Sequence, residues 1–179
     1  MIDPVLDLSI RLALALLFVM AAWHKARDRA RFSATLRAYR LLPAWTVSPV
    51  SRLLPLFEAC TAMGLLYAPT REAAVVVALT LLALYSFAIA ANLVLGRREI
   101  DCGCFASSAP VPLSGWLLVR NGVLIAAACA LLVPVRARVL VWLDLLTVVM
   151  TLLTVSVLWA AGRRLAATGP ALRRIGGAR

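Results

Sequence analysis

The residues in this sequence best suited to chemistry are two cysteines separated by one glycine, Cys102-Gly103-Cys104. A disulfide between these cysteines would close a very small ring, and glycine has the backbone that best tolerates such a bend. Strained and exposed disulfides tend to be labile or catalytic, so the motif favours thiol–disulfide redox chemistry. A Cys-x-Cys motif is weak by itself, and a copper or zinc site or two incidental loop cysteines remain alternatives.

The surroundings of the four cysteines separate them into two kinds. Basic residues at Arg97, Arg98 and Lys25 would favour the thiolate form of the loop pair, which is the reactive form. Cys60 and Cys129 instead lie inside apolar runs, where we expect inert packing thiols. Only the loop pair is therefore a candidate for redox chemistry.

The composition is that of a bilayer protein. The 179 residues are 63% hydrophobic with a mean hydropathy of +0.93, whereas soluble domains are roughly 45–50% apolar. Five runs meet or approach the ~20 apolar residues that cross a bilayer, namely about 5–23, 51–68, 72–95, 115–134 and 139–161. We predict an all-α polytopic membrane helix bundle, with four core transmembrane helices plus a fifth C-terminal one. Residues 1–161 form its single domain and 162–179 a basic, flexible tail.

The first run and the charge distribution refine this prediction. The first run has no basic leader or small-residue cleavage site, so we expect it to stay as a membrane anchor.

The net charge of +11 comes from arginines beside apolar spans, which indicates anionic lipid headgroups and not nucleic acid as partner. Phe32, Leu36 and Tyr39 recur at helical spacing between basic residues, and this pattern predicts an interfacial helix that Pro43 ends.

If consecutive spans cross alternately, one end of the bundle carries most of the unusual residues. We call this end face A. It holds the end of the first span, the start of the second, the end of the third, the start of the fourth and the C-terminus. Its polar residues are His24, Lys25, Glu58, Asn92, the loop Cys102 to Phe105, Arg120 and Asn121. At a rise of 1.5 Å per residue, Glu58, Asn92 and Arg120 should lie one or two turns below that surface.

Glu58 and Arg120 interrupt two apolar spans, at a cost of about 2.5–3.5 kcal/mol each at bilayer depth. We predict that they form an ion pair. This pair would either lock two spans together, or line a pocket that handles the protons of disulfide exchange or binds a quinone-like electron acceptor. Lys25 is expected to extend to the lipid headgroups, and His24 to be solvated or to carry protons. Asp144 has Arg136, Arg138 or water as candidate partners.

Several of these residues together resemble the methylamine utilisation protein MauE family, which is grouped with DoxX-like membrane proteins. The similarity covers roughly residues 8–135, and departs from the family at Ala106, where glycine is usual. The residues that carry it are His24-Lys25-Ala26-Arg27-Asp28, Tyr39-Arg40-Leu41-Leu42-Pro43, Glu58, Asp101-Cys102-Gly103-Cys104-Phe105 and Val119-Arg120-Asn121. The resemblance implies a redox role in maturing the disulfide-rich small subunit of methylamine dehydrogenase, alongside a thioredoxin-like, MauD-like partner.

Two arguments about orientation in the bacterial cytoplasmic membrane disagree. Face A carries fourteen basic residues and the other face three, so the positive-inside rule makes face A cytoplasmic. Delivery of disulfides to an exported enzyme would place the thiols outside. We favour the charge argument.

The sequence supports three functions. The first is a membrane thiol–disulfide oxidoreductase or electron relay, with Cys102 and Cys104 as the redox pair and Glu58, Arg120 and Lys25 as supporting charges. The second is a non-enzymatic assembly factor or scaffold for a thioredoxin-like protein. The third, a small-solute or metal transporter, is the weakest, because few polar residues line the rest of the bundle.

Overall fold

The computed structural model describes residues 1–97, 115–136, 138–139, 141–154, 156–157 and 160, and in this part of the chain nearly all secondary structure is helical. The main elements are α1 (Pro4–Arg27), α2 (Arg29–Tyr39), α3 (Ala44–Leu66), the 3-10 turn η1 (Ala68–Thr70), α4 (Arg71–Val94) and α5 (Gly115–Ala130). A further apolar helix covers Trp142–Thr154. The prediction of an all-α protein is confirmed.

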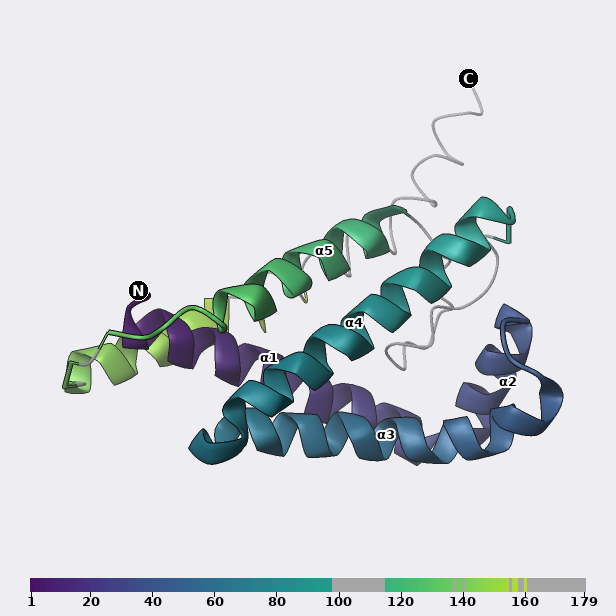
Figure 1. Ribbon diagram of the computed structural model, residues 1–179, viewed down its shortest axis with the longest axis horizontal. Helices are drawn as coiled ribbons and strands as arrows, with labels where there is room; N and C mark the ends of the chain where they lie inside the picture. The colour runs from purple at the N-terminus through teal and green to yellow at the C-terminus, as the bar shows by residue number, and fades with distance from the viewer. Residues whose placement is uncertain (98–114, 137, 140, 155, 158–159, 161–179) are drawn as a thin grey trace, which may run out of the picture.

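The helices pack as antiparallel neighbours (Figure 1). α1 lies along α3, η1 turns α3 back into α4, and α5 packs on α4. The end of α1, the start of α3, the end of α4 and the start of α5 therefore lie at the same end of the bundle, as predicted for face A. We call the opposite end face B.

Local sequence explains where α1 and α2 begin and end. Asp3 caps the start of α1 by accepting a hydrogen bond from the Val5 amide at 2.9 Å. Asp28 ends α1 and starts α2, where its carboxylate accepts from the Arg31 amide at 3.0 Å. α2 then ends at Arg40, in the left-handed conformation with φ 51°.

The helix that contains the predicted second span begins before that span. α3 begins at Ala44, directly after Pro43, and not at residue 51. Residues 44–50 extend this helix past the end of α1, where they pack beside α2 (Figure 1). Glu58 is consequently about 21 Å along α3 from its first residue, although its contact with Lys25 places it beside the last turn of α1.

The distribution of polarity is inverted relative to a soluble protein. Buried polar residues lie inside the bundle, among them Asp7, Lys25, Glu58, Asn92 and Asn121. Large apolar side chains cover the outside of the helices, far more than a soluble surface exposes. Two helical segments, Pro4–Arg27 and Ala68–Val94, are long and apolar enough to cross a membrane. These features indicate a membrane protein.

Exposed aromatic residues mark both ends of the bundle. Trp23 is in the last turn of α1, and Trp45 and Trp116 are in the first turns of α3 and α5, so all three are at face A. Tyr67 directly follows α3 at face B, and Trp142 begins the helix that comes after the end of α5 there. Trp45 and Tyr67 are 22 residues apart along α3, which is about 33 Å of helix. This separation matches the ~30 Å of a hydrocarbon core, whose two interfaces favour such aromatic side chains.

Arginines close face B by binding the carbonyls that helix ends leave without partners. Arg71 donates to the Leu131 carbonyl and to the Asp7 carboxylate, both at 2.7 Å. Arg11 donates to the Leu65 carbonyl at 2.8 Å, at the end of α3. The Asp7–Arg71 contact therefore joins α1 and α4 to the end of α5.

A second, exposed cluster lies at the same end. Arg138 forms ion pairs with Asp144 at 2.9 Å and with Asp3 at 3.2 Å. The prediction that Arg138 is a partner for Asp144 is confirmed. Hydrogen bonds from Arg138 and from the Val5 amide hold the pKa of Asp3 below its ordinary value.

We predict that Arg71→Gln lowers the free energy of unfolding by about 3 kcal/mol, because it leaves the buried Asp7 carboxylate without its closest cation. Denaturation in detergent, followed by tryptophan fluorescence, measures this loss. Arg136→Gln is the matched control, since Arg136 is exposed and its side chain forms no ion pair within the described residues. Equal losses in the two variants would show that Asp7–Arg71 is not a structural contact.

Candidate functional site

The most unusual feature of the bundle is a buried ion pair between α1 and α3. Lys25 Nζ contacts Glu58 Oε1, with side-chain exposures of 4% and 0%. Lys25 is in the last turn of α1, and its side chain lies against the bundle, not toward the headgroups. The expectation that Lys25 extends to the lipid surface is therefore wrong.

Tyr85 of α4 completes this cluster. Its hydroxyl donates to Glu58 Oε1 at 2.5 Å and accepts from Lys25 Nζ at 3.0 Å. The Lys25 ammonium also lies 4.6 Å from the centre of the Tyr85 ring and 5.4 Å from that of Phe32 on α2, within the range of cation–π attraction. Four helices thus enclose one ammonium group.

The cluster combines an acid, a base and a phenol that share protons through one carboxylate oxygen. Both donors bind Glu58 Oε1, while the buried Oε2 has no hydrogen-bond partner within the described residues. Buried ions are stable only when they are paired and hydrogen-bonded. Removing one member therefore leaves another uncompensated in the apolar interior.

The predicted pairing of Glu58 with Arg120 is wrong. Among the described residues no ion pair joins them, and Glu58 turns to α1 and α4. Arg120 is on α5, which packs on α4, and its guanidinium donates to Asn121 Oδ1 at 3.2 Å. Asn121 in turn donates to the Ser86 hydroxyl at 3.3 Å. Arg120 therefore belongs to a second polar contact, between α4 and α5.

Both ends of the segment between α4 and α5 carry polar contacts at face A. Arg97, just after α4, donates to the Tyr39 carbonyl of α2 at 3.3 Å. Asn92 is fully buried, and its Oδ1 has no hydrogen-bond partner in the described part of the chain. Of the polar residues predicted for face A, His24, Lys25, Asn92, Arg120 and Asn121 are described on the helix ends that meet there.

The predicted redox cysteines, Cys102 and Cys104, lie outside the described residues. Cys60 and Cys129 are described as free, exposed thiols on the outside of α3 and α5. Cys60 is exposed whereas Glu58, two residues earlier on α3, is fully buried, so the two side chains point to different sides of the helix. In the described ranges no three histidine, cysteine or acidic residues gather as metal ligands would.

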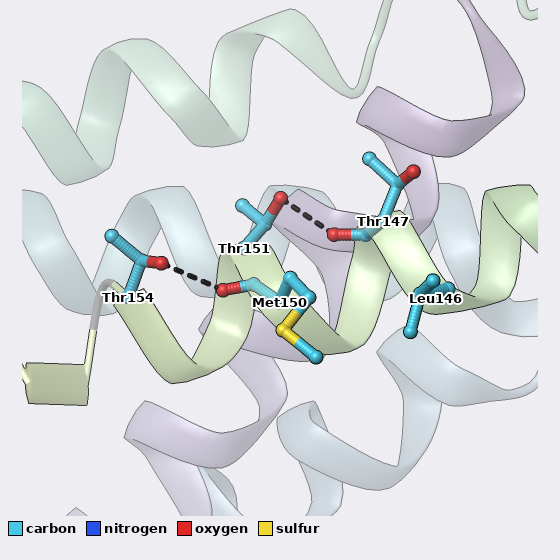
Figure 2. A pocket seen from close by; sticks show the side chains of 5 residues that line it. All are labelled: Leu146, Thr147, Met150, Thr151 and Thr154. Carbon is cyan, nitrogen blue, oxygen red and sulfur yellow. Dashed lines mark hydrogen bonds between the residues drawn. The ribbon is translucent and has the colours of Figure 1, made fainter.

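A groove of about 440 Å³ lies on the Trp142–Thr154 helix, away from the charged cluster (Figure 2). Its lining residues are Leu146, Thr147, Met150, Thr151 and Thr154. The hydroxyls of Thr151 and Thr154 donate to backbone carbonyls of the same helix at 2.8 Å. The groove therefore offers mainly methyl and methylene groups, without a charged residue in its lining.

The fold and the site define a class: a helical membrane protein with a buried Lys–Glu–Tyr cluster in its interior. Comparison with known proteins then gives the family. The profile of the methylamine utilisation protein MauE family matches residues 3–134, and the chain belongs to this family.

Curated relatives agree with this assignment. The methylamine utilization protein MauE of Paracoccus denitrificans is 40% identical, over 78% of this chain and 75% of the relative. The protein of the same name from Methylorubrum extorquens is 40% identical, over 74% of this chain and 73% of the relative. No solved structure matches this chain. The family resemblance predicted from sequence is confirmed.

A double-mutant cycle tests the observed pairing. Glu58→Gln and Lys25→Met should each destabilise the protein, and the double variant should be more stable than their sum predicts by about 1 kcal/mol or more. Glu58→Gln combined with Arg120→Gln should instead be additive within about 0.5 kcal/mol. Unfolding in detergent measures all five variants, and coupling to Arg120 alone would contradict the structure.

Proposed function

We propose that this chain is a membrane thiol–disulfide redox protein of methylamine utilisation, with Cys102 and Cys104 as its redox pair. The observation that carries the proposal is the buried Lys25–Glu58–Tyr85 cluster. Ionisable groups inside a membrane are costly and are characteristic of proton and substrate sites. The family and the names of the curated relatives supply the connection with methylamine.

The proposed reaction is exchange with a partner disulfide. Cys102 and Cys104 lose two electrons and two protons as their S–S bond forms, and the partner disulfide takes up both as it becomes a dithiol. A thioredoxin-like protein of MauD type is the proposed partner, and the small subunit of methylamine dehydrogenase is the proposed client. A membrane quinone is an alternative acceptor, which the same two electrons and two protons would convert to a quinol.

The charged residues have supporting roles in this proposal. Arg97 follows α4 directly and Arg120 is in the second turn of α5, so both flank the segment that contains the cysteines. Cations beside a cysteine favour its thiolate. Lys25, Glu58 and Tyr85 hold three helices in register and provide a proton-sharing group below face A.

A non-enzymatic assembly factor is the second candidate, and the burial of the cluster favours it. Glu58 and Lys25 are closed off by the helices and by the Phe32 and Tyr85 rings. A cluster with so little exposed surface can act purely as a lock that positions face A for a thioredoxin-like partner. The two candidates differ in whether the loop thiols change oxidation state.

We further propose that the chain crosses the bacterial cytoplasmic membrane several times. The aromatic residues at faces A and B, and the apolar outer surface between them, support this topology. The arginines of α2 and of the residues after α4 favour a cytoplasmic face A. Lys25 does not add to that surface charge, because it is paired inside the bundle.

Alkylation tests the redox proposal. In part of the protein population, Cys102 and Cys104 should react with a maleimide of high molecular mass only after a reductant has been added. A Cys104→Ser variant should trap a mixed disulfide between Cys102 and the partner. Cys60→Ser with Cys129→Ser provides the background in which only the loop thiols report. Identical labelling with and without reductant, and no trapped partner, would favour the assembly factor.

Orientation requires a separate experiment. In the same background, a membrane-impermeant maleimide should label the loop thiols only after cell lysis if face A is cytoplasmic. The charge distribution predicts this outcome. Strong labelling of intact cells would overturn it and place the thiols on the side of an exported client.

A further inference from the structure

The outer surface of α2 and its neighbours carries an unneutralised group of arginines. The group consists of Arg27, Arg29, Arg37, Arg40 and Arg52, and all five are exposed. No ion pair joins any of them to a carboxylate within the described residues. The carboxylate of the nearby Asp28 accepts a hydrogen bond at the start of α2 as its N-cap. We call this group the arginine belt.

The packing of α2 places the arginine belt at the level of a membrane interface. Phe32 and Tyr39 are buried against the bundle, Phe32 over Lys25 and Tyr39 against Ile89 and Leu117. The apolar side of α2 therefore faces protein and not lipid, so the arginines remain at the surface. Exposed Trp23, in the last turn of α1, and exposed Trp45, in the first turn of α3, are at the same end of the bundle, and indole rings favour the headgroup region.

We propose that the arginine belt is a binding surface for the phosphate groups of anionic phospholipids. Guanidinium groups bind phosphate through paired hydrogen bonds, and each basic residue near an anionic membrane strengthens attraction to it. The exposed apolar residues Leu41, Leu42 and Trp45 adjoin the belt. A lipid can therefore place its phosphate on arginine and its acyl chains on these side chains, which an inorganic phosphate ion cannot.

A bound lipid would also act on the buried Lys25 cluster, because α2 carries both arginines of the belt and the Phe32 ring that covers Lys25. α2 presents Arg29, Arg37 and Arg40 outward and Phe32 inward, over the Lys25 ammonium. Lipid that neutralises the arginines removes their mutual repulsion and holds α2 against α3. Anionic lipid should therefore stabilise the closed form of the Lys25 cluster, whether or not the loop thiols are redox-active.

The test uses the full chain purified in a neutral detergent and titrated with dioleoyl phosphatidylglycerol, dioleoyl phosphatidylcholine or inorganic phosphate. Native mass spectrometry measures lipid retention, and tryptophan fluorescence measures the thermal midpoint. We expect phosphatidylglycerol to bind more tightly than phosphatidylcholine and to raise the midpoint. The Arg29→Gln, Arg37→Gln, Arg40→Gln triple variant should lose about a hundredfold in affinity, from about fivefold per arginine.

Two controls keep the result decisive. The corresponding triple lysine variant keeps the charge but loses the paired hydrogen bonds, so its affinity should lie between those of the unchanged protein and the glutamine variant. Arg136→Gln at face B should bind like the unchanged protein. If the glutamine variant does not fold, binding by the unchanged protein should still weaken as salt is raised. Equal binding of both lipids, equal stabilisation by inorganic phosphate, salt-insensitive binding or an equal loss in Arg136→Gln would overturn the proposal.

Discussion

The architecture depends on the cost of keeping the Lys25 and Glu58 charges inside an apolar bundle. Neither ion is stable there alone, so α1 and α3 have to meet at the depth where both side chains reach each other. Tyr85 then fixes α4, since its hydroxyl binds both partners. Phe32 covers the ammonium and thereby fixes α2. The positions of four helices follow from one pair of charges.

The two ends of the bundle differ in how their charged side chains are paired. At face B, Arg11 and Arg71 bind Asp7 and the carbonyls at the ends of α3 and α5, which closes this end by direct pairing. At face A, arginines stay exposed and polar groups of α4 and α5 flank the segment that carries the cysteines. Among the described residues, face A is therefore the end at which several arginines are exposed without a carboxylate partner, whereas face B is closed by ion pairs.

Much of the fold follows from the sequence, because apolar length and helical spacing are local properties. The helical regions, the α2 helix with Phe32 and Tyr39 on its apolar side, and the candidates Lys25 and Glu58 were all predictable. The burial of Phe32 and Tyr39 against protein was not, because the pattern of α2 also fits a helix that lies on lipid. The partner of Glu58 was not, since choosing between Lys25 and Arg120 requires knowing which helices touch. Tyr85 was missed because a tyrosine in an apolar span looks like an ordinary packing residue. Tyr85 has a role in the cluster only because its hydroxyl lies beside two buried charges.

In the proposed function, the buried Lys25–Glu58–Tyr85 cluster and the Cys102–Cys104 pair act as one functional unit. The most direct measurement is the rate at which the Cys102–Cys104 disulfide re-forms in native membranes after a pulse of reductant, followed by alkylation, in the unchanged protein and in Tyr85→Phe. This variant keeps the Lys25–Glu58 ion pair and removes only the hydroxyl. Re-formation should slow about tenfold or more, as for loss of a proton-transfer group, while the lost hydroxyl hydrogen bonds should lower the free energy of unfolding by only about 1–2 kcal/mol. An unchanged rate would contradict the claim and leave the cluster as a structural lock.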